Sequence, residues 1–464
     1  MPLDVPPSPP APPTLAPAAP PPPRPLPSRR AATRRTPPAD SFIIDGGVPL
    51  GGTVRVSGSK NEALPALCAT LLTDQPVTLE NVPRIRDVDV LCAILAALGA
   101  GVEWLAEDSV RVTAARIRTT VVPEVLARRL RASVLLLGPL LARAGRVELG
   151  PPGGDVIGRR RLDTHVLALG ALGASVALDE TLRLSTPGLC GADIFLDEPS
   201  VTATENAVMA AVLARGRTVL RNAACEPHVA GLCRMLTRMG ARIDGVGTNT
   251  LTVEGVKSLW GGTHRVGPDA LEAGSFMGLA AATGGELTLE GTRPEDLRST
   301  RVVYERLGVS FETEGDRVHV RGRQDLRIRP DLFDGMPRID DGPWPAFPTD
   351  MMSVVITLAT QCKGSILFFE KMYEGRMFFT DSLVAMGARI TLCDPHRVVV
   401  TGPTPLHGAV LESPDVRAGM ALVVAALCAR GRSVIHHVHH VDRGYHRVDE
   451  KLRRLGARIE RVSG

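Results

Sequence analysis

Apolar and polar positions follow one pattern that recurs six times along this chain. Each copy is an apolar helical stretch that ends in Leu-Gly or Met-Gly and runs into a strand-like alternation. The glycines that close these stretches recur at near-constant spacing and are Gly99, Gly173, Gly240, Gly308, Gly387 and Gly456. Glycine after a helical run favours the left-handed conformation that ends a helix, and the alternation predicts a half-buried strand.

A short β-rich run precedes these copies, as in Val-Thr-Leu-Glu from Val77 and Thr-Val-Leu-Arg from Thr218. Each unit is therefore predicted to be strand, loop, helix, glycine turn and strand. A chain of 464 residues exceeds the size at which a single core usually keeps growing. Six units in such a chain predict an α/β protein with two domains of three units each.

The first 41 residues differ from the rest, since they hold sixteen prolines and almost nothing that could form a core. This composition predicts a disordered or polyproline-II tail over 1–41. Its Pro-x-x-Pro spacings are compatible with an SH3-like partner, but a solvated extension is the simpler interpretation.

Composition excludes several classes of function. A net charge of only +4 and 3% aromatic residues argue against nucleic-acid binding. Eight cysteines without a C-x-x-C pair indicate a reduced protein rather than a disulfide scaffold. The sequence has no apolar run long enough for a membrane span and no secretory signal, so we expect a cytoplasmic protein.

Two glycine-containing loops carry charge ahead of apolar helices. Lys60 and Asn61 follow a Ser-Gly-Ser turn, and a lysine at a helix N-terminus opposes the helix dipole unless an anion lies between them. The loop at 150–162 holds Asp155 and three consecutive arginines, 159–161. Such a loop is suited to close over a charged substrate, although a solvated surface loop is equally compatible.

Two further features carry acids and arginines. Asp350 follows Phe-Pro-Thr at the start of an apolar stretch, where on sequence alone an N-terminal cap is the favoured interpretation. Arg376, Arg417 and Arg443 each lie near an acidic residue in the last repeats. They could form plain salt bridges, but equivalent places in the repeats favour an anion site, because arginine forks match carboxylate and phosphate.

Together these loops resemble the enolpyruvyl transferase family, in the branch that acts on UDP-N-acetylglucosamine. The stretches that carry the resemblance are Ser-Gly-Ser-Lys-Asn at 57–61, Pro-Gly-Gly-x-x-Ile-Gly at 152–158, Phe-Pro-Thr-Asp at 347–350 and Asp-Arg-Gly-Tyr at 442–445. It extends from Ser41 to Gly464. The branch that acts on shikimate 3-phosphate shares the six-unit fold but lacks the Phe-Pro-Thr-Asp loop in this form.

The resemblance implies a two-domain inside-out α/β barrel of six βαβ-type repeats. One domain would hold 60–266 and the other 42–59 with 267–464. It also implies transfer of the enolpyruvyl group of phosphoenolpyruvate to the 3′-hydroxyl of UDP-N-acetylglucosamine, the first committed step of peptidoglycan synthesis. The 3′-hydroxyl attacks C2 while C3 is protonated, and the tetrahedral adduct then loses phosphate.

The resemblance assigns roles residue by residue. Asp350 would be the base at the sugar hydroxyl, and Asp155 would act at C3. The cations that clamp phosphate and carboxylate would be Lys60, Arg160, Arg376, Arg417 and Arg443. The sugar-nucleotide side would be lined by Asn61, Arg131, Asp163, Ser200, Val201, Thr202 and Thr349, and Met372 would be a further substrate-binding residue. No metal or other cofactor is implied.

This chain departs from the family pattern at several positions. Many members carry a cysteine where Asp155 stands, and fosfomycin alkylates that cysteine, so we expect natural fosfomycin resistance. Arg161, Cys225, Pro199 and Thr202 stand where proline, arginine, lysine and glycine are common. The nucleotide side could therefore suit another acceptor, and a shikimate-pathway enzyme or a non-catalytic binding paralogue are further alternatives.

The histidines at 436, 437, 439 and 440 invite a metal interpretation. We expect them in a strand, where 437 and 439 would share one face. Two histidines without partner acids at ligand spacing make a poor metal site, and the chemistry needs no metal.

Overall fold

The computed structural model describes residues 40–155 and 157–463, which belong to one compact unit. Most of the predicted tail lies outside these residues. Ser41, expected as the last residue of that tail, is the first residue of a strand. Among the described residues, no helix is long and apolar enough to cross a membrane.

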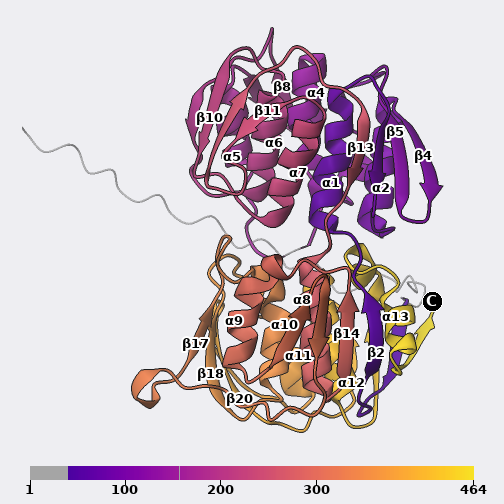
Figure 1. Ribbon diagram of the computed structural model, residues 1–464, viewed down its shortest axis with the longest axis vertical. Helices are drawn as coiled ribbons and strands as arrows, with labels where there is room; N and C mark the ends of the chain where they lie inside the picture. The colour runs from indigo at the N-terminus through magenta and orange to yellow at the C-terminus, as the bar shows by residue number, and fades with distance from the viewer. Residues whose placement is uncertain (1–39, 156, 464) are drawn as a thin grey trace, which may run out of the picture. The chain divides into compact units, whose positions relative to one another are not determined.

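The described residues form six small sheets, each built on one predicted repeat (Figure 1). The first three sheets, with strands in spatial order, are β13 (Gly262–Arg265), β3 (Val77–Glu80), β5 (Ser109–Thr113) and β4 (Gly101–Ala106); β6 (Arg146–Leu149), β8 (Leu182–Ser185) and β7 (Ser175–Leu178); and β11 (Arg242–Asp244), β12 (Thr250–Glu254), β10 (Arg217–Arg221) and β9 (Asp193–Phe195). The hairpin that follows each glycine turn forms one edge of its sheet, as the alternation predicts.

The other three sheets follow the same plan. In spatial order they are β15 (Phe311–Glu314), β16 (Arg317–Val320), β14 (Glu286–Glu290) and β2 (Gly51–Arg55); β17 (Arg338–Asp340), β18 (Gly364–Phe369), β20 (Arg397–Gly402) and β19 (Arg389–Asp394); and β21 (Val410–Glu412), β22 (Arg432–His436), β1 (Ser41–Asp45) and β23 (Arg458–Val462). In the last sheet β1, from the start of the described chain, takes the place of a hairpin strand between β22 and β23.

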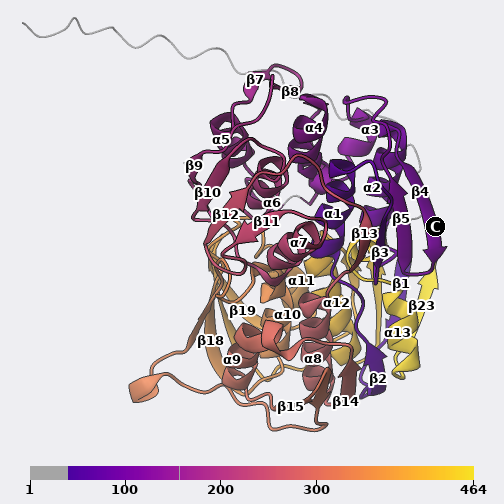
Figure 2. The ribbon, with the colours of Figure 1, turned by 45° about the horizontal axis from the view of Figure 1, so that its top comes forward.

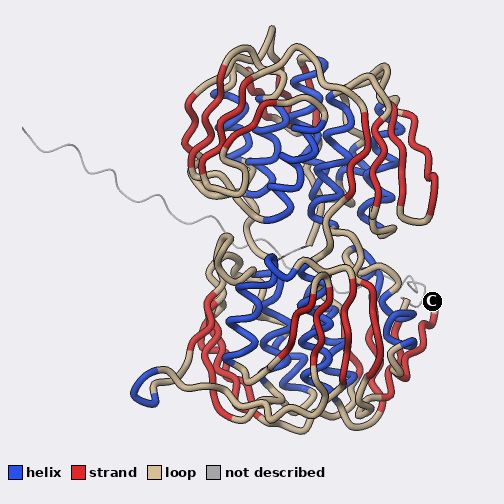
Figure 3. The backbone as a smooth tube through the Cα atoms, viewed as in Figure 1, coloured by secondary structure: helices blue, strands red, loops and turns tan. Residues whose placement is uncertain are grey.

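The sheets fall into two groups, and within each group helices lie between the sheets (Figure 3). The inner ones are α1 (Lys60–Ala69), α4 (Leu137–Ala144), α6 (Val201–Ala211), α8 (Ala270–Thr283), α10 (Thr349–Ala359) and α12 (Val416–Cys428). Most of their residues are buried, including polar ones such as Glu62 and Asn206, as expected of helices that are enclosed on all sides. In α12, for example, every residue from Val416 to Leu427 is buried.

The remaining helices connect the strands of each repeat. Those that end at the repeat glycines are α2 (Arg86–Leu98), α5 (Asp163–Ala171), α7 (Pro227–Arg238), α9 (Arg298–Arg306), α11 (Thr380–Ala385) and α13 (Val448–Arg454), and a short α3 (Glu124–Ala127) lies in the second repeat. Short 3₁₀ turns are η1 (Thr70–Leu72), η2 (Arg131–Leu136), η3 (Pro294–Leu297), η4 (Leu332–Asp334) and η5 (Val438–Arg443). All six repeat glycines have a positive φ, between 84° and 108°, so the predicted left-handed helix ends are confirmed.

Buried apolar residues form two clusters. The first core contains residues from Ala63 to Val266, and the second contains Phe42 to Val56 together with Ala273 to Ile459. We propose that these cores correspond to two domains, 60–266 and 42–59 with 267–464. The predicted α/β repeat architecture itself is confirmed.

The chain passes between the two cores twice, and the two passages lie against each other. Ser59 N donates to Gly267 O at 2.7 Å, and Asp269 N donates to Ser57 O at 2.9 Å. A Cβ atom on Gly58 would lie 1.6 Å from Asn81 O, so this close approach requires glycine. The paired passages place the start of α1 beside the start of α8 (Figure 2).

The histidine segment differs from the expectation. Only His436 belongs to β22; His437 has a φ of 59°, and His439 and His440 lie in η5. A left-handed residue ends the strand, so the predicted two-faced alternation does not occur. The rings of His437, His439 and His440 instead contact one another: His437 and His440 are stacked with centroids 6.4 Å apart, and His439 meets His440 edge-on at 4.2 Å.

Candidate active site

A cavity of about 320 Å³ opens where the helices of both cores begin. Its lining includes residues in the first turn of five inner helices and of α7: Lys60, Thr202, Pro227, Leu271, Asp350 and Arg417. Helix N-termini carry partial positive charge and unpaired N–H groups. Six of them around one cavity favour an anionic ligand.

Lys60, the first residue of α1, takes part in a chain of four charges that links the two cores. Its Nζ lies 2.6 Å from Asp87 Oδ2, and Arg443 Nε lies 2.9 Å from Asp87 Oδ1. Arg443 Nη1 also pairs with Asp155 Oδ1. Asp87 is buried, which disfavours its charged form, but Lys60 and Arg443 outweigh this and lower its pKa. The anion expected beside Lys60 is thus a carboxylate of the protein itself.

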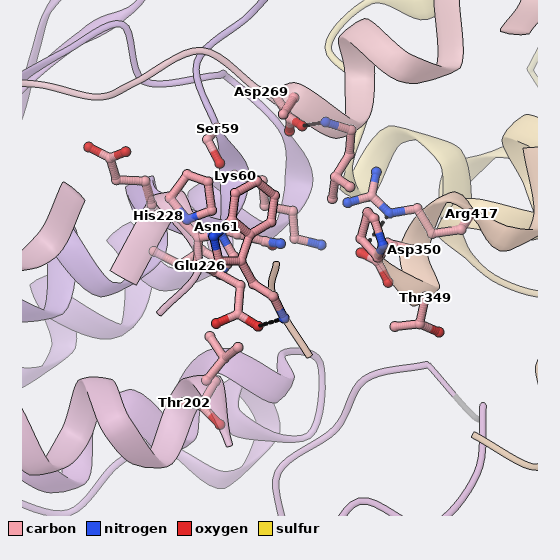
Figure 4. A pocket seen from close by; sticks show the side chains of 18 of the residues that line it. Ser59, Lys60, Asn61, Thr202, Glu226, His228, Asp269, Thr349, Asp350 and Arg417 are labelled. Atoms are coloured by element: carbon pink, nitrogen blue, oxygen red, sulfur yellow. Dashed lines mark hydrogen bonds and ion pairs between the residues drawn. The ribbon is translucent and has the colours of Figure 1, made fainter. Parts of the chain in front are cut away.

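Asp350 faces Lys60 across the cavity (Figure 4). Arg376 Nη2 donates to its Oδ1 at 2.8 Å, and Arg417 Nε donates to its Oδ2 at 3.0 Å. Partial burial disfavours the carboxylate, yet the charges of Arg417 and Arg376 hold the pKa of Asp350 well below its usual range. The N-cap interpretation of Asp350 was wrong: Pro348 is the N-cap of α10, and Asp350 is the second helical residue.

Each of the two arginines beside Asp350 has a nitrogen donor without a hydrogen-bond partner among the described residues. Arg376 and Arg417 are 3% and 4% exposed, and Arg376 Nε and Arg417 Nη1 have no hydrogen-bond partner among the described residues. Buried charged donors are seldom left unpaired in proteins. Both residues line the cavity, and their unpaired donors suit an anionic oxygen.

The glycine-rich loop is attached to the second core. Ile157 O accepts from Gly375 N at 2.9 Å, and Arg159 N donates to Glu374 Oε2 at 3.2 Å. Arg131 Nη2 in turn donates to Arg160 O at 2.8 Å. These contacts hold Asp155 and Arg160 at the cavity wall.

The opposite wall is polar and largely buried. Asn206 Nδ2 donates to His165 Nδ1 at 2.9 Å, and His165 Nε2 lies 3.1 Å from Thr202 Oγ1. Burial lowers the pKa of His165 to about 3, so its neutral ring fixes the Thr202 hydroxyl. Burial also raises the pKa of Glu226, and its Oε2 has no partner among the described residues.

The structure brings most of the predicted site residues to one cavity. Those that line it are Lys60, Asn61, Arg131, Asp155, Arg160, Val201, Thr202, Thr349, Asp350, Met372, Arg376, Arg417 and Arg443. Ser200 and Asp163 do not line it. Ser200 caps α6, where its Oγ accepts from Ala203 N, and Asp163 is exposed and pairs with Arg161 at 3.2 Å.

The three arginines of the last repeats are not in equivalent places. Arg376 and Arg443 lie in matching loops, after β18 and β22, but Arg417 lies in the first turn of the inner helix α12. Asp415 caps that helix and accepts from Arg417 N at 2.7 Å. The repeats therefore explain two of the three positions.

Sequence reasoning missed Asp87, the carboxylate that joins Lys60 to Arg443. It lies in the first turn of α2 among residues that read as an ordinary helix start, and nothing near it marks it as buried. Cys225, one of the departures, lies 3.5 Å from Trp344 O, so its thiol faces a loop of the second core. Among the described residues, no group of three or more His, Cys, Asp or Glu could hold a metal ion.

Comparison with known proteins identifies this architecture. The family model of EPSP synthase (3-phosphoshikimate 1-carboxyvinyltransferase) matches residues 44–452. UDP-N-acetylglucosamine 1-carboxyvinyltransferase of Bradyrhizobium diazoefficiens is 54% identical over 421 residues, covering 91% of this chain and 98% of that protein. The enzyme of the same name from Treponema denticola is 52% identical over 419 residues, covering 90% and 98%.

Solved structures of enolpyruvyl transferases have the same fold as this chain. The enolpyruvyl transferase NikO from Streptomyces tendae has a TM-score of 0.82 at 26% identity and covers 92% of this chain and 100% of that chain. EPSP synthase from Acinetobacter baumannii shows the same fold, with a TM-score of 0.71 at 19% identity over 91% of this chain and 100% of that chain. The chain belongs to the enolpyruvyl transferase family of EPSP synthase, in the group of UDP-N-acetylglucosamine 1-carboxyvinyltransferases.

Proposed function

We propose that this protein transfers the enolpyruvyl group of phosphoenolpyruvate to the 3′-hydroxyl of UDP-N-acetylglucosamine, in the cytoplasm, as the committed step of peptidoglycan synthesis. The observation that carries this proposal is the placement of Asp350 between two buried arginines, opposite Lys60 and Arg443, in a cavity where six helices begin. The relatives at 52% and 54% identity bear the name of this reaction.

The cations are suited to bind the phosphate and carboxylate of phosphoenolpyruvate. Each of Lys60, Arg376, Arg417 and Arg443 is held by an internal carboxylate in the described structure. These carboxylates hold the cations in place when no ligand is bound. An incoming anion would replace the carboxylates as partners of the cations. Preorganised charges of this kind stabilise the phosphate as it leaves and cost little reorganisation.

Asp350 would accept the proton of the sugar hydroxyl. Its low pKa in the described structure depends on Arg376 and Arg417. Phosphoenolpyruvate would draw these arginines away and add negative charge nearby, and both effects raise the pKa of a carboxyl. Asp350 would thus become a stronger base only when the substrate is present. Asp155 would act at C3 from the glycine-rich loop.

The direct test is phosphate release by the purified protein with phosphoenolpyruvate and one acceptor at a time. We expect turnover with UDP-N-acetylglucosamine and none with shikimate 3-phosphate or with UMP. Release with shikimate 3-phosphate alone would move the protein to the other branch of the family. Release with UMP alone would show that the changes at Thr202 and Cys225 mark another nucleotide acceptor, and silence with all three would favour a binding-only paralogue.

A second prediction concerns fosfomycin. A carboxylate is a much poorer soft nucleophile than a thiolate, so Asp155 should not open the epoxide. Intact-protein mass spectrometry after incubation with fosfomycin and UDP-N-acetylglucosamine should show unmodified protein. The matched variant Asp155→Cys should gain one fosfomycin adduct and lose activity with time. An adduct on the unaltered protein would contradict the prediction.

A further inference from the structure

Beside the cavity lies a buried pair of carboxyl groups that the proposed mechanism does not use. Glu370 follows β18 and is 0% exposed; Asp341 follows β17 and is 3% exposed. The two strands pair in parallel, with Asp340 opposite Phe369. Both strands therefore end at the same end of the sheet, and Asp341 and Glu370, the residues that follow them, leave it next to each other.

Glu370 joins the start of α10 to the loop that carries Arg376. Its Oε1 and Oε2 accept from Thr349 Oγ1 at 2.9 and 2.8 Å. Its Oε1 also accepts from the backbone N of Met372 and of Tyr373, both at 3.1 Å. Thr349, Met372 and Tyr373 all line the cavity, and Thr349 directly precedes Asp350. One side chain thus sets the position of three cavity residues.

Asp341 holds the same loop from the other side. Its Oδ1 accepts from Lys371 N at 2.5 Å, and its Oδ2 is buried without a hydrogen-bond partner among the described residues. A proton on the Glu370 carboxyl would give Asp341 Oδ2 that partner. Burial, and then the hydrogen bond and negative charge of Asp341, raise the pKa of Glu370 to about 8. Two buried carboxyls in contact are stable when they share one proton.

We propose that Glu370 and Asp341 share one proton and act as positioning residues that hold Thr349 and the loop 371–376 against the phosphoenolpyruvate site. The identity of that ligand rests on the proposed function, but the shared proton does not. The Glu370 side chain receives two N–H groups and one hydroxyl, and its own proton satisfies Asp341. Loss of the proton would place two negative charges in contact without water, which forces the loop away from α10.

The other charged groups around the pair do not replace the proton. Arg376, on the same loop, lowers the pKa of Glu370 but bonds to Asp350. His396, from the β19–β20 hairpin, places its Nδ1 2.7 Å from the Glu370 backbone oxygen rather than its carboxyl. Lys371 pairs with Asp340 at 2.7 Å. Among the described residues no cation bonds to the Glu370 carboxyl.

The direction of the pH effect follows from linkage. Because the pKa of Glu370 is raised on folding, the native state binds more protons than the unfolded state between the ordinary glutamate range and about pH 8. The free energy of unfolding should therefore fall as pH rises through that window. Positioning of the loop should be lost as pH passes about 8, and with it affinity for phosphoenolpyruvate.

Two variants of the full chain test this. Glu370→Gln keeps the acceptor for Met372 and Tyr373 and offers Asp341 a permanent donor, so it imitates the protonated state. At pH 7 its KM for phosphoenolpyruvate should stay within about three-fold of the unaltered protein. Its alkaline fall in kcat/KM near pH 8 should disappear, and its melting temperature should depend less on pH between 6 and 9. Glu370→Ala should raise that KM by about ten-fold or more with a smaller change in kcat.

Glu314→Gln, an exposed glutamate on β15, is the matched control and should behave as the unaltered protein. An unchanged alkaline limb and unchanged melting profile in Glu370→Gln would overturn the proposal, whether or not Glu370→Ala folds. If the protein turns over none of the tested acceptors, the melting temperatures against pH still decide the shared proton, which separates this result from failure of the proposed function.

Discussion

Asp350→Ala should lower kcat by about 10²–10⁴, the range typical of a lost general base. Asp350 is the carboxylate that both Arg376 and Arg417 hold in the cavity, and no other acid bonds to both of these arginines among the described residues. Its removal would take away the proposed proton acceptor and free the arginines. We therefore expect phosphoenolpyruvate to bind as tightly as before or more tightly, as followed by fluorescence of Trp344, which lines the cavity.

Controls separate this role from a structural one. Asp350→Asn keeps the size of the side chain but cannot accept the proton at neutral pH, so its kcat should fall nearly as far. Asp325→Ala removes an exposed aspartate from the same proposed domain and should leave turnover unchanged. A kcat within about three-fold of the unaltered protein in Asp350→Ala would contradict its role as base. So would a loss of phosphoenolpyruvate binding that accounts for the whole effect.

The same residue predicts a difference between two pH profiles. The acid limb of kcat/KM reports the free enzyme, in which the arginines hold the pKa of Asp350 well below its usual range. The acid limb of kcat reports the enzyme with substrates bound, in which those arginines would face phosphoenolpyruvate. The limb of kcat assigned to Asp350 should therefore lie at higher pH than that of kcat/KM.

The repeat architecture could be predicted because local rules act in every copy. Gly308, for example, ends α9 with a φ of 84°, and a Cβ atom there would lie 2.5 Å from Arg327 N. The positive φ, though not the close approach, recurs in each repeat, where it selects glycine and makes the period visible in one sequence. The replacement of a hairpin strand by β1 could not be predicted, since it depends on a pairing between the two ends of the described chain.

The site was predictable where a residue type is unusual for its local setting. A lysine that begins a helix conflicts with a purely structural role, whereas Asp350 alone indicates only a helix cap and is assigned to the site through the family resemblance. Asp87 and Glu370 give no such signal, because an acid in a first helical turn or after a strand is ordinary. Their importance arises from contacts with Arg443 and Thr349, which are distant in sequence.

Arg443→Ala should lower kcat/KM for phosphoenolpyruvate by about 10²–10⁴, equivalent to the loss of two charge-assisted hydrogen bonds of roughly 1.5–3 kcal/mol each. Arg443 is the one residue in the described structure that bonds to both Asp87 and Asp155, and so joins the helix start of α2 to the glycine-rich loop. Without it Asp87 keeps only Lys60 as a partner, and Asp155 loses its position at the cavity wall.

Arg443→Lys should recover little, because an ammonium group cannot bond to two carboxylates and an incoming anion through a planar fork. Arg432→Ala is the matched control: Arg432 pairs with Asp45 at the end of β1, both side chains are accessible to solvent, and the loss of such an exposed pair changes stability little. Steady-state phosphate release over a range of phosphoenolpyruvate concentrations separates KM from kcat in each variant. If Arg443→Lys restores most of the activity, charge alone suffices at this position, and the bridging geometry between Asp87 and Asp155 has no part in catalysis.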